Sequence, residues 1–139
     1  MTIHLHKHDL PDGVDFGRAV AIDTETQGLS LVRDKLCLVQ LSAGDGDAHI
    51  VQMDRNAYDA PNLKALVLNA DVTKIFHFAR FDVAIMQRDL GVDTMGIFCT
   101  KIASGLVRTY TDRHGRKDLT KELLGVDMSK QQQSSDWAA

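Results

Sequence analysis

The spacing of apolar residues changes once along this chain, close to Pro61. Before that point, three runs rich in Val, Ile and Leu cover residues 18–26, 36–44 and 47–53, with Gly- and Asp-bearing turns between them. Runs this close together predict an antiparallel meander of three strands. After Pro61 the apolar residues recur at helical spacing. The chain is therefore expected to begin with strands and to continue with helices.

Short strands and helices alternate in the second half of the sequence. Residues 74–78 and 96–100 are brief apolar runs typical of strands. Helical stripes cover residues 80–91, 101–108 and 118–125. A meander followed by strand–helix units predicts an α/β protein, in which helices flank a mixed sheet of antiparallel meander strands plus parallel strands. The length fits one domain over residues 1–139.

Composition bears on where such a protein works. Apolar residues make up 44% of the chain and charged residues 25%, as in soluble globular proteins. No apolar run approaches the roughly 18 residues that cross a bilayer, and the start, MTIHLHKHDLPDG, lacks the basic-then-apolar order of a secretory signal. Cys37 and Cys99 lie in apolar, strand-like runs, so we expect buried free thiols. These features predict a cytoplasmic protein that does not associate with membranes.

Two acidic residues follow the apolar part of the first strand-like run. Val20 and Ile22 are strand residues, and Asp23 and Glu25 come at the strand's end. Side chains two residues apart on a strand point to the same face, so the two carboxylates should project together. Like charges this close raise each other's proton affinity, and a hard divalent cation such as Mg²⁺ or Mn²⁺ would neutralise them. A solvated acidic strand end is the alternative interpretation.

A third acidic residue, Asp82, falls in the first turn of the helix predicted after residues 74–78, and His77 lies at the end of that strand. A helix N-terminus beside an open sheet edge brings acidic groups towards the end of the first strand. Asp82 could then join the other two carboxylates. The alternatives are that Asp82 only caps its helix and that His77 is a hydrogen-bonded residue near the core.

Longer stretches of the sequence carry a resemblance to a known family. DTETQGL (23–29) and HFARFD (77–82) resemble the first and second motifs of the DEDD 3′→5′ exonucleases of the ribonuclease D type. CTKIAS (99–104), the segment 108–130 and QQQSSDW (131–137) resemble the nanoRNase C type of bacterial oligoribonuclease within that superfamily. The similarity runs through nearly the whole chain. It implies a ribonuclease H-like fold and a 3′→5′ exoribonuclease that hydrolyses dinucleotides and other short RNAs.

The resemblance also implies roles for individual residues. Asp23, Glu25 and Asp82 match three of the four family carboxylates that bind two divalent ions, Mg²⁺ or Mn²⁺, and they are expected to be catalytic. Leu29 matches the apolar residue that wedges against the terminal bases in related oligoribonucleases, and a core leucine is its alternative. The other residues expected to contact the substrate are Thr24, His77, Arg80 and Tyr110. Family likeness further implies a ring-like homo-oligomer.

The family's third motif, Tyr-x-x-x-Asp, stands on a helix further along than a segment like SSDWAA (134–139). This chain ends at Ala139, so the fourth carboxylate and the tyrosine that positions the attacking water are not part of it. Asp136 matches the loop before that helix and is expected to be structural. The resemblance therefore implies a C-terminally truncated domain without the third-motif helix, and low or no activity for the isolated chain.

Basic and imidazole side chains outside these motifs have two interpretations each. The basic group near Tyr110 consists of Arg113, His114, Arg116, Lys117 and Lys121. These side chains could bind a substrate phosphate, but a solvated helix face or a subunit contact is favoured for each of them. His4, His6 and His8 alternate like one face of a strand. A plain edge strand is favoured there over a transition-metal site.

The net charge of −3 helps to choose between possible substrates. Proteins that track a long polyanion usually carry a basic stripe, because counterion release drives their binding. The first hypothesis is therefore an exoribonuclease whose partners are dinucleotides, short RNAs and single-stranded 3′ ends. The second is a ribonuclease D-like enzyme that trims structured RNA, which would normally add helical RNA-binding domains. The third is a catalytically impaired protein that acts only in binding or assembly.

Overall fold

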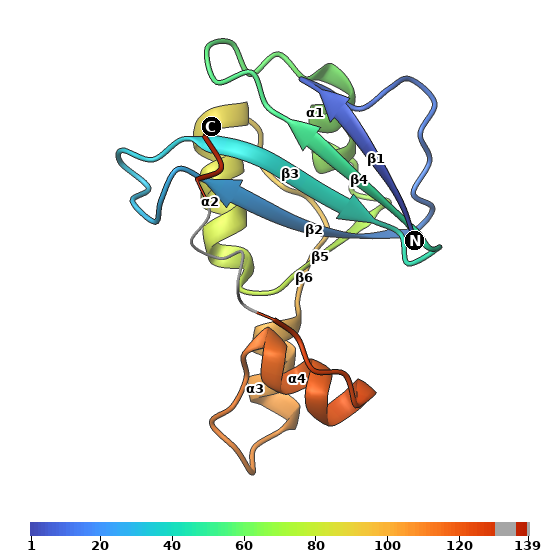
Figure 1. Cartoon of the computed structure of the whole chain (residues 1–139), viewed down its shortest axis with the longest axis vertical. Helices are drawn as coiled ribbons and strands as arrows, with labels where there is room; N and C mark the ends of the chain where they lie inside the picture. The colour runs from blue at the N-terminus through green and yellow to red at the C-terminus, as the bar shows by residue number, and fades with distance from the viewer. Residues whose placement is uncertain (130–135, 139) are drawn as a thin grey trace.

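A computed structural model describes residues 1–129 and 136–138. Within these residues the chain forms six strands and four helices. The strands are β1 (Thr2–Lys7), β2 (Ala19–Thr26), β3 (Leu36–Ser42), β4 (Asp47–Gln52), β5 (Thr73–Phe76) and β6 (Ile97–Cys99). The helices are α1 (Pro61–Leu68), α2 (Ala79–Leu90), α3 (Thr100–Val107) and α4 (Arg116–Leu124). All strands belong to one sheet with the order β1-β4-β3-β2-β5-β6 (Figure 1).

The sheet is mixed, as the sequence predicts. β2, β3 and β4 form the antiparallel meander, while β5 runs parallel to β2 and β6 parallel to β5. β1 is a parallel edge strand beside β4, with His4 opposite His49 in the register. The edge strand favoured for His4 and His6 is thus confirmed, whereas His8 follows the strand with a φ of 73°. His6 Nε2 lies 2.9 Å from His49 Nδ1, and the rings of His4, His6 and His49 stack.

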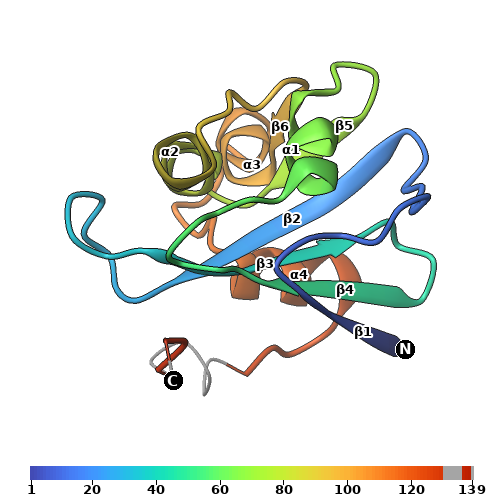
Figure 2. The same ribbon diagram turned by 90° about the horizontal axis from the view of Figure 1, so that it is seen from above.

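Two helices cover one face of the sheet and close the core. Figure 2 shows α1 and α2 on the same side of β2 and β5. Pro61 stands in the first turn of α1, where its missing N–H costs no hydrogen bond. The helix residues that are fully buried against the sheet are Leu63, Val67, Ile85 and Met86. Each such side chain stabilises the fold by about 2 kcal/mol through removal of apolar surface from water.

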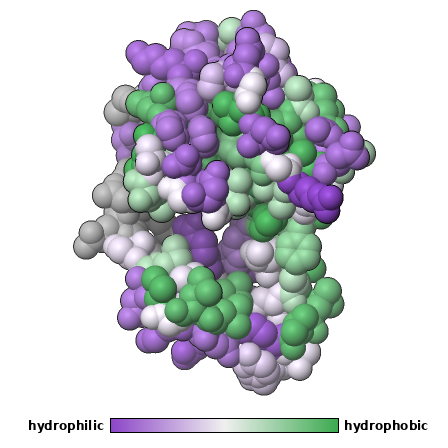
Figure 3. All heavy atoms as spheres, turned by 90° about the vertical axis from the view of Figure 1, so that its right-hand side faces the viewer, coloured by the Kyte–Doolittle hydropathy of each residue, from purple (hydrophilic) through white to green (hydrophobic). Residues whose placement is uncertain are grey.

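The other two helices form a separate part of the molecule, which we call the α3–α4 lobe (residues 100–124). Figure 1 shows that the lobe follows the end of β6 and lies below the sheet. In Figure 2, α4 lies on the opposite side of the sheet from α1. A cavity of about 750 Å³ separates the lobe from the sheet. Its lining includes Ala21, Gln40 and Ala48 on the sheet and Leu119 and Leu123 on α4. The hollow between the two parts is visible in the space-filling view (Figure 3).

The two cysteines are free thiols that differ in burial. Cys37 is buried as expected, but Cys99 is only half-buried. Cys99 ends β6 directly before α3, at the junction with the exposed lobe, and its Sγ accepts a hydrogen bond from the N–H of Ala79 at 3.4 Å. Among the described residues, no helix combines the length and apolar character needed to span a membrane.

The last described segment, residues 136–138, lies beside the loop that follows β4. Arg55 Nη2 donates a hydrogen bond to the carbonyl of Ala138 at 3.0 Å. Asp136 Oδ1 accepts the N–H of Ala138 at 3.1 Å, so this carboxylate forms a local turn in accord with its expected structural role. Residues 130–135, which carry part of the family-like stretch QQQSSDW, lie outside the described residues.

Candidate active site

β2 presents two carboxylates on one face and two threonines on the other. Thr24 and Thr26 are buried on the side that α1 and α2 cover. Asp23 and Glu25 are half-buried and alternate with them along the strand, as the period of two predicts. In the antiparallel register Asp23 lies opposite Gln40 of β3. The two acidic side chains therefore project together from the centre of the sheet.

The turn between β5 and α2 places Asp82 against β2. Phe78, which precedes the helix, has a φ of 66°, a left-handed conformation that is costly for a bulky residue. Asp82 then falls in the first turn of α2 with only 4% of its surface exposed. Its Oδ1 accepts a hydrogen bond from Thr24 Oγ1 at 2.5 Å. The alternative that Asp82 only caps its helix is wrong, because its partner is on β2 and α2 has no side-chain cap among the described residues.

The Thr24–Asp82 bond joins positions 58 residues apart and brings the second motif to the first. Thr24 lies between Asp23 and Glu25 in the sequence, so α2 is attached at the point of β2 from which both carboxylates project. The hydroxyl of Thr24, expected to contact the substrate, is engaged with Asp82 in this structure. The alternation along β2 places this hydroxyl on the covered face, but it does not reveal which helix residue it would meet.

The three carboxylates repel one another. Burial raises the pKa of Asp82 to about 7; the hydrogen bonds with Thr24 oppose this shift, and the charges of Asp23 and Glu25 add to it. Burial also raises the pKa of Glu25, and the charge of Asp23 raises it further, while Arg116 lowers it. A cation bound between these carboxylates would reduce their mutual repulsion.

Arg116, at the start of α4, supplies a positive charge that reaches across from the lobe. Its Nη1 lies 3.1 Å from Asp23 Oδ2, while Asp23 Oδ1 accepts the N–H of Thr24 at 3.1 Å. Both oxygens of Asp23 are therefore engaged. No sequence pattern singles out Arg116 from the other basic residues near Tyr110, because its acidic partner is 93 residues away.

His77 lies at the end of β5, half-buried beside the same cavity. Thr100 Oγ1 donates to the carbonyl of Phe76 at 3.0 Å, so the same oxygen accepts the Nδ1–H of His77 at 2.9 Å. This arrangement leaves Nε2 as the acceptor. Burial lowers the pKa of His77, the charges of Arg116 and Lys101 lower it further, and Asp23 raises it. His77 is therefore a neutral, hydrogen-bonded imidazole near neutral pH.

The chemistry of the three carboxylates fits divalent cations. Carboxylate oxygens are the donors that Mg²⁺ and Mn²⁺ prefer. Burial, together with the charges of the neighbouring carboxylates, raises the pKa values of Asp82 and Glu25. Within residues 1–129 and 136–138, no three His, Cys, Asp or Glu side chains stand as a ready-made metal cluster. Asp23 faces Arg116 and Asp82 faces Thr24, so these contacts must rearrange for the three to share a cation.

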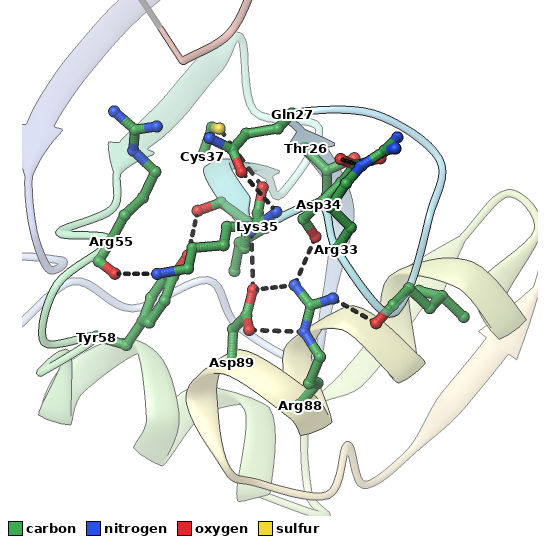
Figure 4. A network of polar contacts seen from close by, with 12 residues as sticks. Thr26, Gln27, Arg33, Asp34, Lys35, Cys37, Arg55, Tyr58, Arg88 and Asp89 are labelled. Atoms are coloured by element: carbon green, nitrogen blue, oxygen red, sulfur yellow. Dashed lines mark hydrogen bonds and ion pairs between the residues drawn. The ribbon is translucent and has the colours of Figure 1, made fainter.

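Leu29 lies in the loop that follows β2, and 86% of its surface is exposed. The alternative of a core leucine is therefore wrong. The loop is held from below: Asp34 Oδ2 accepts the N–H of Ser30 at 2.9 Å, and an added Cβ at Gly28 would overlap the Asp34 carboxylate. Figure 4 shows how Arg88 of α2 bonds the loop backbone, with Nη2 at 2.5 Å from the carbonyl of Asp34. The exposed leucine thus stands on a fixed loop.

The remaining two residues expected to contact substrate lie on different elements. Arg80 is exposed on the first turn of α2. Tyr110 lies in the lobe with 70% of its surface exposed, and its hydroxyl donates to Glu122 Oε1 at 2.7 Å. Arg108 packs over the Tyr110 ring and pairs with the same Glu122. Tyr110 therefore belongs to a polar network inside the lobe, and the structure does not bring it into contact with the three carboxylates.

A mixed sheet of this order, in which Asp82 of α2 bonds Thr24 between Asp23 and Glu25 of β2, matches the ribonuclease H-like exonuclease fold. Residues 6–139 match the family model described as 3′-5′ exonuclease. The chain belongs to this family.

Individual exonucleases are also similar to this chain in sequence and structure. Brucella melitensis NrnC, solved with bound Mg²⁺, is 52% identical with a TM-score of 0.93, and the match covers 100% of this chain and 68% of that one. The same protein bound to pGG is 54% identical with a TM-score of 0.94 and the same coverage. Ribonuclease D of Acidiphilium cryptum is 32% identical over 120 residues, which are 86% of this chain and 30% of the relative. The chain thus spans about a third of the ribonuclease D length.

Proposed function

We propose that this chain acts as a 3′→5′ exoribonuclease that hydrolyses the phosphodiester bonds of dinucleotides and other short RNAs. The observation that carries the proposal is the Thr24–Asp82 hydrogen bond, which brings the buried Asp82 to the strand that holds Asp23 and Glu25. The similarity to NrnC, which has been solved with both Mg²⁺ and pGG, supports the metal and the substrate class.

We assign Asp23, Glu25 and Asp82 as ligands of two divalent ions, Mg²⁺ or Mn²⁺. Such ions supply hydroxide at neutral pH and stabilise the departing oxygen. The chain's own groups prepare this site: Thr24 orients Asp82 from the covered side of the sheet, and Thr100 fixes His77 with Nε2 as its acceptor. His77 and Arg80 lie where the second motif meets the substrate in this proposal.

The exposed Leu29 supports a short substrate. An apolar side chain held on a fixed loop offers a surface for the face of a terminal base. The net charge of −3 favours few phosphates over many. Ribonuclease D-like trimming of longer RNA is the second candidate, and it is favoured by the similarity to Acidiphilium cryptum ribonuclease D.

We further propose that the protein works as a homo-oligomer in the cytoplasm. The lobe carries large apolar side chains that are between 64% and 77% exposed, and these are Ile102, Leu106, Val107, Leu123 and Leu124. Apolar surface of this kind favours contact with another protein surface, and a second copy is the partner that the family likeness implies. Light scattering after gel filtration should give a mass above that of a monomer; a monomer at all concentrations would contradict the assembly alone.

The substrate is tested with two labelled RNAs, the dinucleotide pGG and a long single strand, each with Mn²⁺ and then with chelator. We expect Mn²⁺-dependent hydrolysis that favours pGG. Faster hydrolysis of the long strand would replace the first candidate with the second, and no cleavage of either would leave a binding or assembly role. Asp23→Asn should abolish cleavage, whereas Asp45→Asn, an exposed change in the β3–β4 turn, should not.

A further inference from the structure

α4 is attached to the sheet by very little. None of its residues 116–124, all within the described part of the chain, is buried. A cavity of about 750 Å³ lies between the apolar side of α4 and the sheet. In the described residues, the ion pair between Arg116 and Asp23 is the one hydrogen-bonded contact from α4 to a strand. This pair is therefore the direct polar link between α4 and the sheet, while Thr100 of α3 joins the other side of the lobe to β5 through the carbonyl of Phe76.

The lobe that α4 belongs to is itself well connected. Arg108, only 8% exposed, donates to Ser104 Oγ at 2.9 Å and to the carbonyl of Arg113 at 2.7 Å, and it pairs with Glu122 of α4. Ser104 Oγ also lies 2.7 Å from His114 Nδ1. Because these bonds join α3, the connecting loop and α4, the two helices should move as one body.

Arg116 and a divalent cation compete for the same atoms. Asp23 Oδ2 is occupied by the guanidinium and Oδ1 by the N–H of Thr24. A cation that binds Asp23 weakens the pair, because it repels the guanidinium and draws on the same carboxylate charge.

We propose that Arg116 is a positioning residue that holds the α4 side of the α3–α4 lobe over the sheet by occupying Asp23, and that divalent cations release this side of the lobe when they bind. This inference rests on the proposed metal site. Cation binding at Asp23 and release of α4 from the sheet are therefore thermodynamically coupled. Removal of the Arg116 charge should strengthen cation binding, and cation binding should loosen α4 in the wild-type protein.

The test uses the whole chain and three proteins: the wild type, Arg116→Gln and Arg113→Gln. Arg113 lies in the loop just before α4 and is exposed, so its substitution removes an equal charge without touching Asp23. Mn²⁺ affinity is measured by titration calorimetry, and backbone hydrogen exchange of residues 116–124 is measured with and without Mn²⁺. Neither readout requires catalysis.

We expect Arg116→Gln to bind Mn²⁺ about threefold to fivefold more tightly than the wild type, the range of a partly exposed ion pair, and Arg113→Gln to match the wild type. Exchange in 116–124 should rise with Mn²⁺ in the wild type and be high in Arg116→Gln from the start. Equal affinities of the two variants, or exchange that ignores Mn²⁺, would overturn the proposal while the metal site stands. If none of the three proteins binds Mn²⁺, the metal site itself falls.

Discussion

The sheet with its covering helices and the α3–α4 lobe are stabilised by different interactions. In the first part, α1 and α2 bury apolar residues such as Leu63 and Ile85 completely. In the lobe, α3 buries Ser104 and α4, within the described chain, buries none of its residues; the polar contacts of Arg108 join the two helices. The three carboxylates stand on the packed part. The lobe contributes Arg116, which reaches them from outside.

The packed part keeps the carboxylates in place, and the weakly attached lobe supplies a side chain that reaches them. Carboxylates that share a cation must keep their relative positions, and close packing of the helices on the sheet provides that rigidity. A part that opens and closes must instead be held by few contacts of low stability. The division predicts that equivalent changes in the two parts should have unequal consequences.

The largest expected difference concerns two glutamates. Glu25→Gln removes a proposed metal ligand from the packed part and should lower turnover of pGG more than about a hundredfold, because several kcal/mol of transition-state stabilisation come from such ions. Glu122→Gln removes a carboxylate from the lobe and should retain most of the turnover. Steady-state kinetics with circular dichroism as a folding control measures both. Similar losses in the two variants would remove the distinction between the parts.

Truncation of a leucine should lower the free energy of unfolding much more in the packed sheet and helices than in the α3–α4 lobe. Leu63→Ala empties a fully buried site and should lower the free energy of unfolding by about 3 kcal/mol. Leu123→Ala changes a side chain that is 66% exposed and should stay within about 0.5 kcal/mol of the wild type. Urea unfolding followed by circular dichroism compares them. A large loss for the lobe variant would mean that the lobe is packed in solution.

Asp82 should make stability depend on pH in a chelator-treated sample. Its pKa is raised from 3.8 to about 7 in the folded protein, so the folded state holds the proton more tightly than the unfolded state. Stability attributable to this carboxyl is therefore fully present below pH 3.8 and is lost as pH rises through about 7. Asp82→Asn should gain about 2 kcal/mol over the wild type between pH 5 and pH 8. A difference that does not change with pH would contradict the burial of the charge.

The smallest expected effect lies on the loop after β2. Leu29→Ala should raise KM for pGG roughly threefold to tenfold with little change in kcat, as loss of one apolar contact does. Val32→Ala is the matched control, because Val32 is in the same loop and 96% exposed. Equal KM values for the two variants would show that Leu29 does not contact the substrate.

Much of the fold follows from local patterns in the sequence. The three closely spaced apolar runs within residues 18–53 predict the meander, and the alternation along β2 predicts that Asp23 and Glu25 share a face. The pairing of β1 with β4 does not follow from these patterns, because a strand's partner is chosen by tertiary packing rather than by its own residues. The turn at Phe78 gives no signal either, since a bulky aromatic residue ordinarily avoids a positive φ.

The sequence predicts which residues belong to the site better than it predicts their contacts. Family motifs single out Asp82, but its bond to Thr24 depends on how α2 packs against β2. The sequence equally allowed Leu29 to be a core residue, because the adjacent residues do not determine whether its side chain is exposed. The partner of Arg116 lies 93 residues away, so only the folded chain identifies it. Long-range polar contacts are thus what the sequence leaves open.

The proposed function requires Asp23, Glu25 and Asp82 to bind divalent ions together. A crystal soaked in Mn²⁺ and measured near the manganese absorption edge tests it directly through the anomalous signal. We expect a peak within about 2.5 Å of carboxylate oxygens from both Asp23 and Asp82. A peak bound by only one of these two segments, or no peak at saturating Mn²⁺, would contradict it.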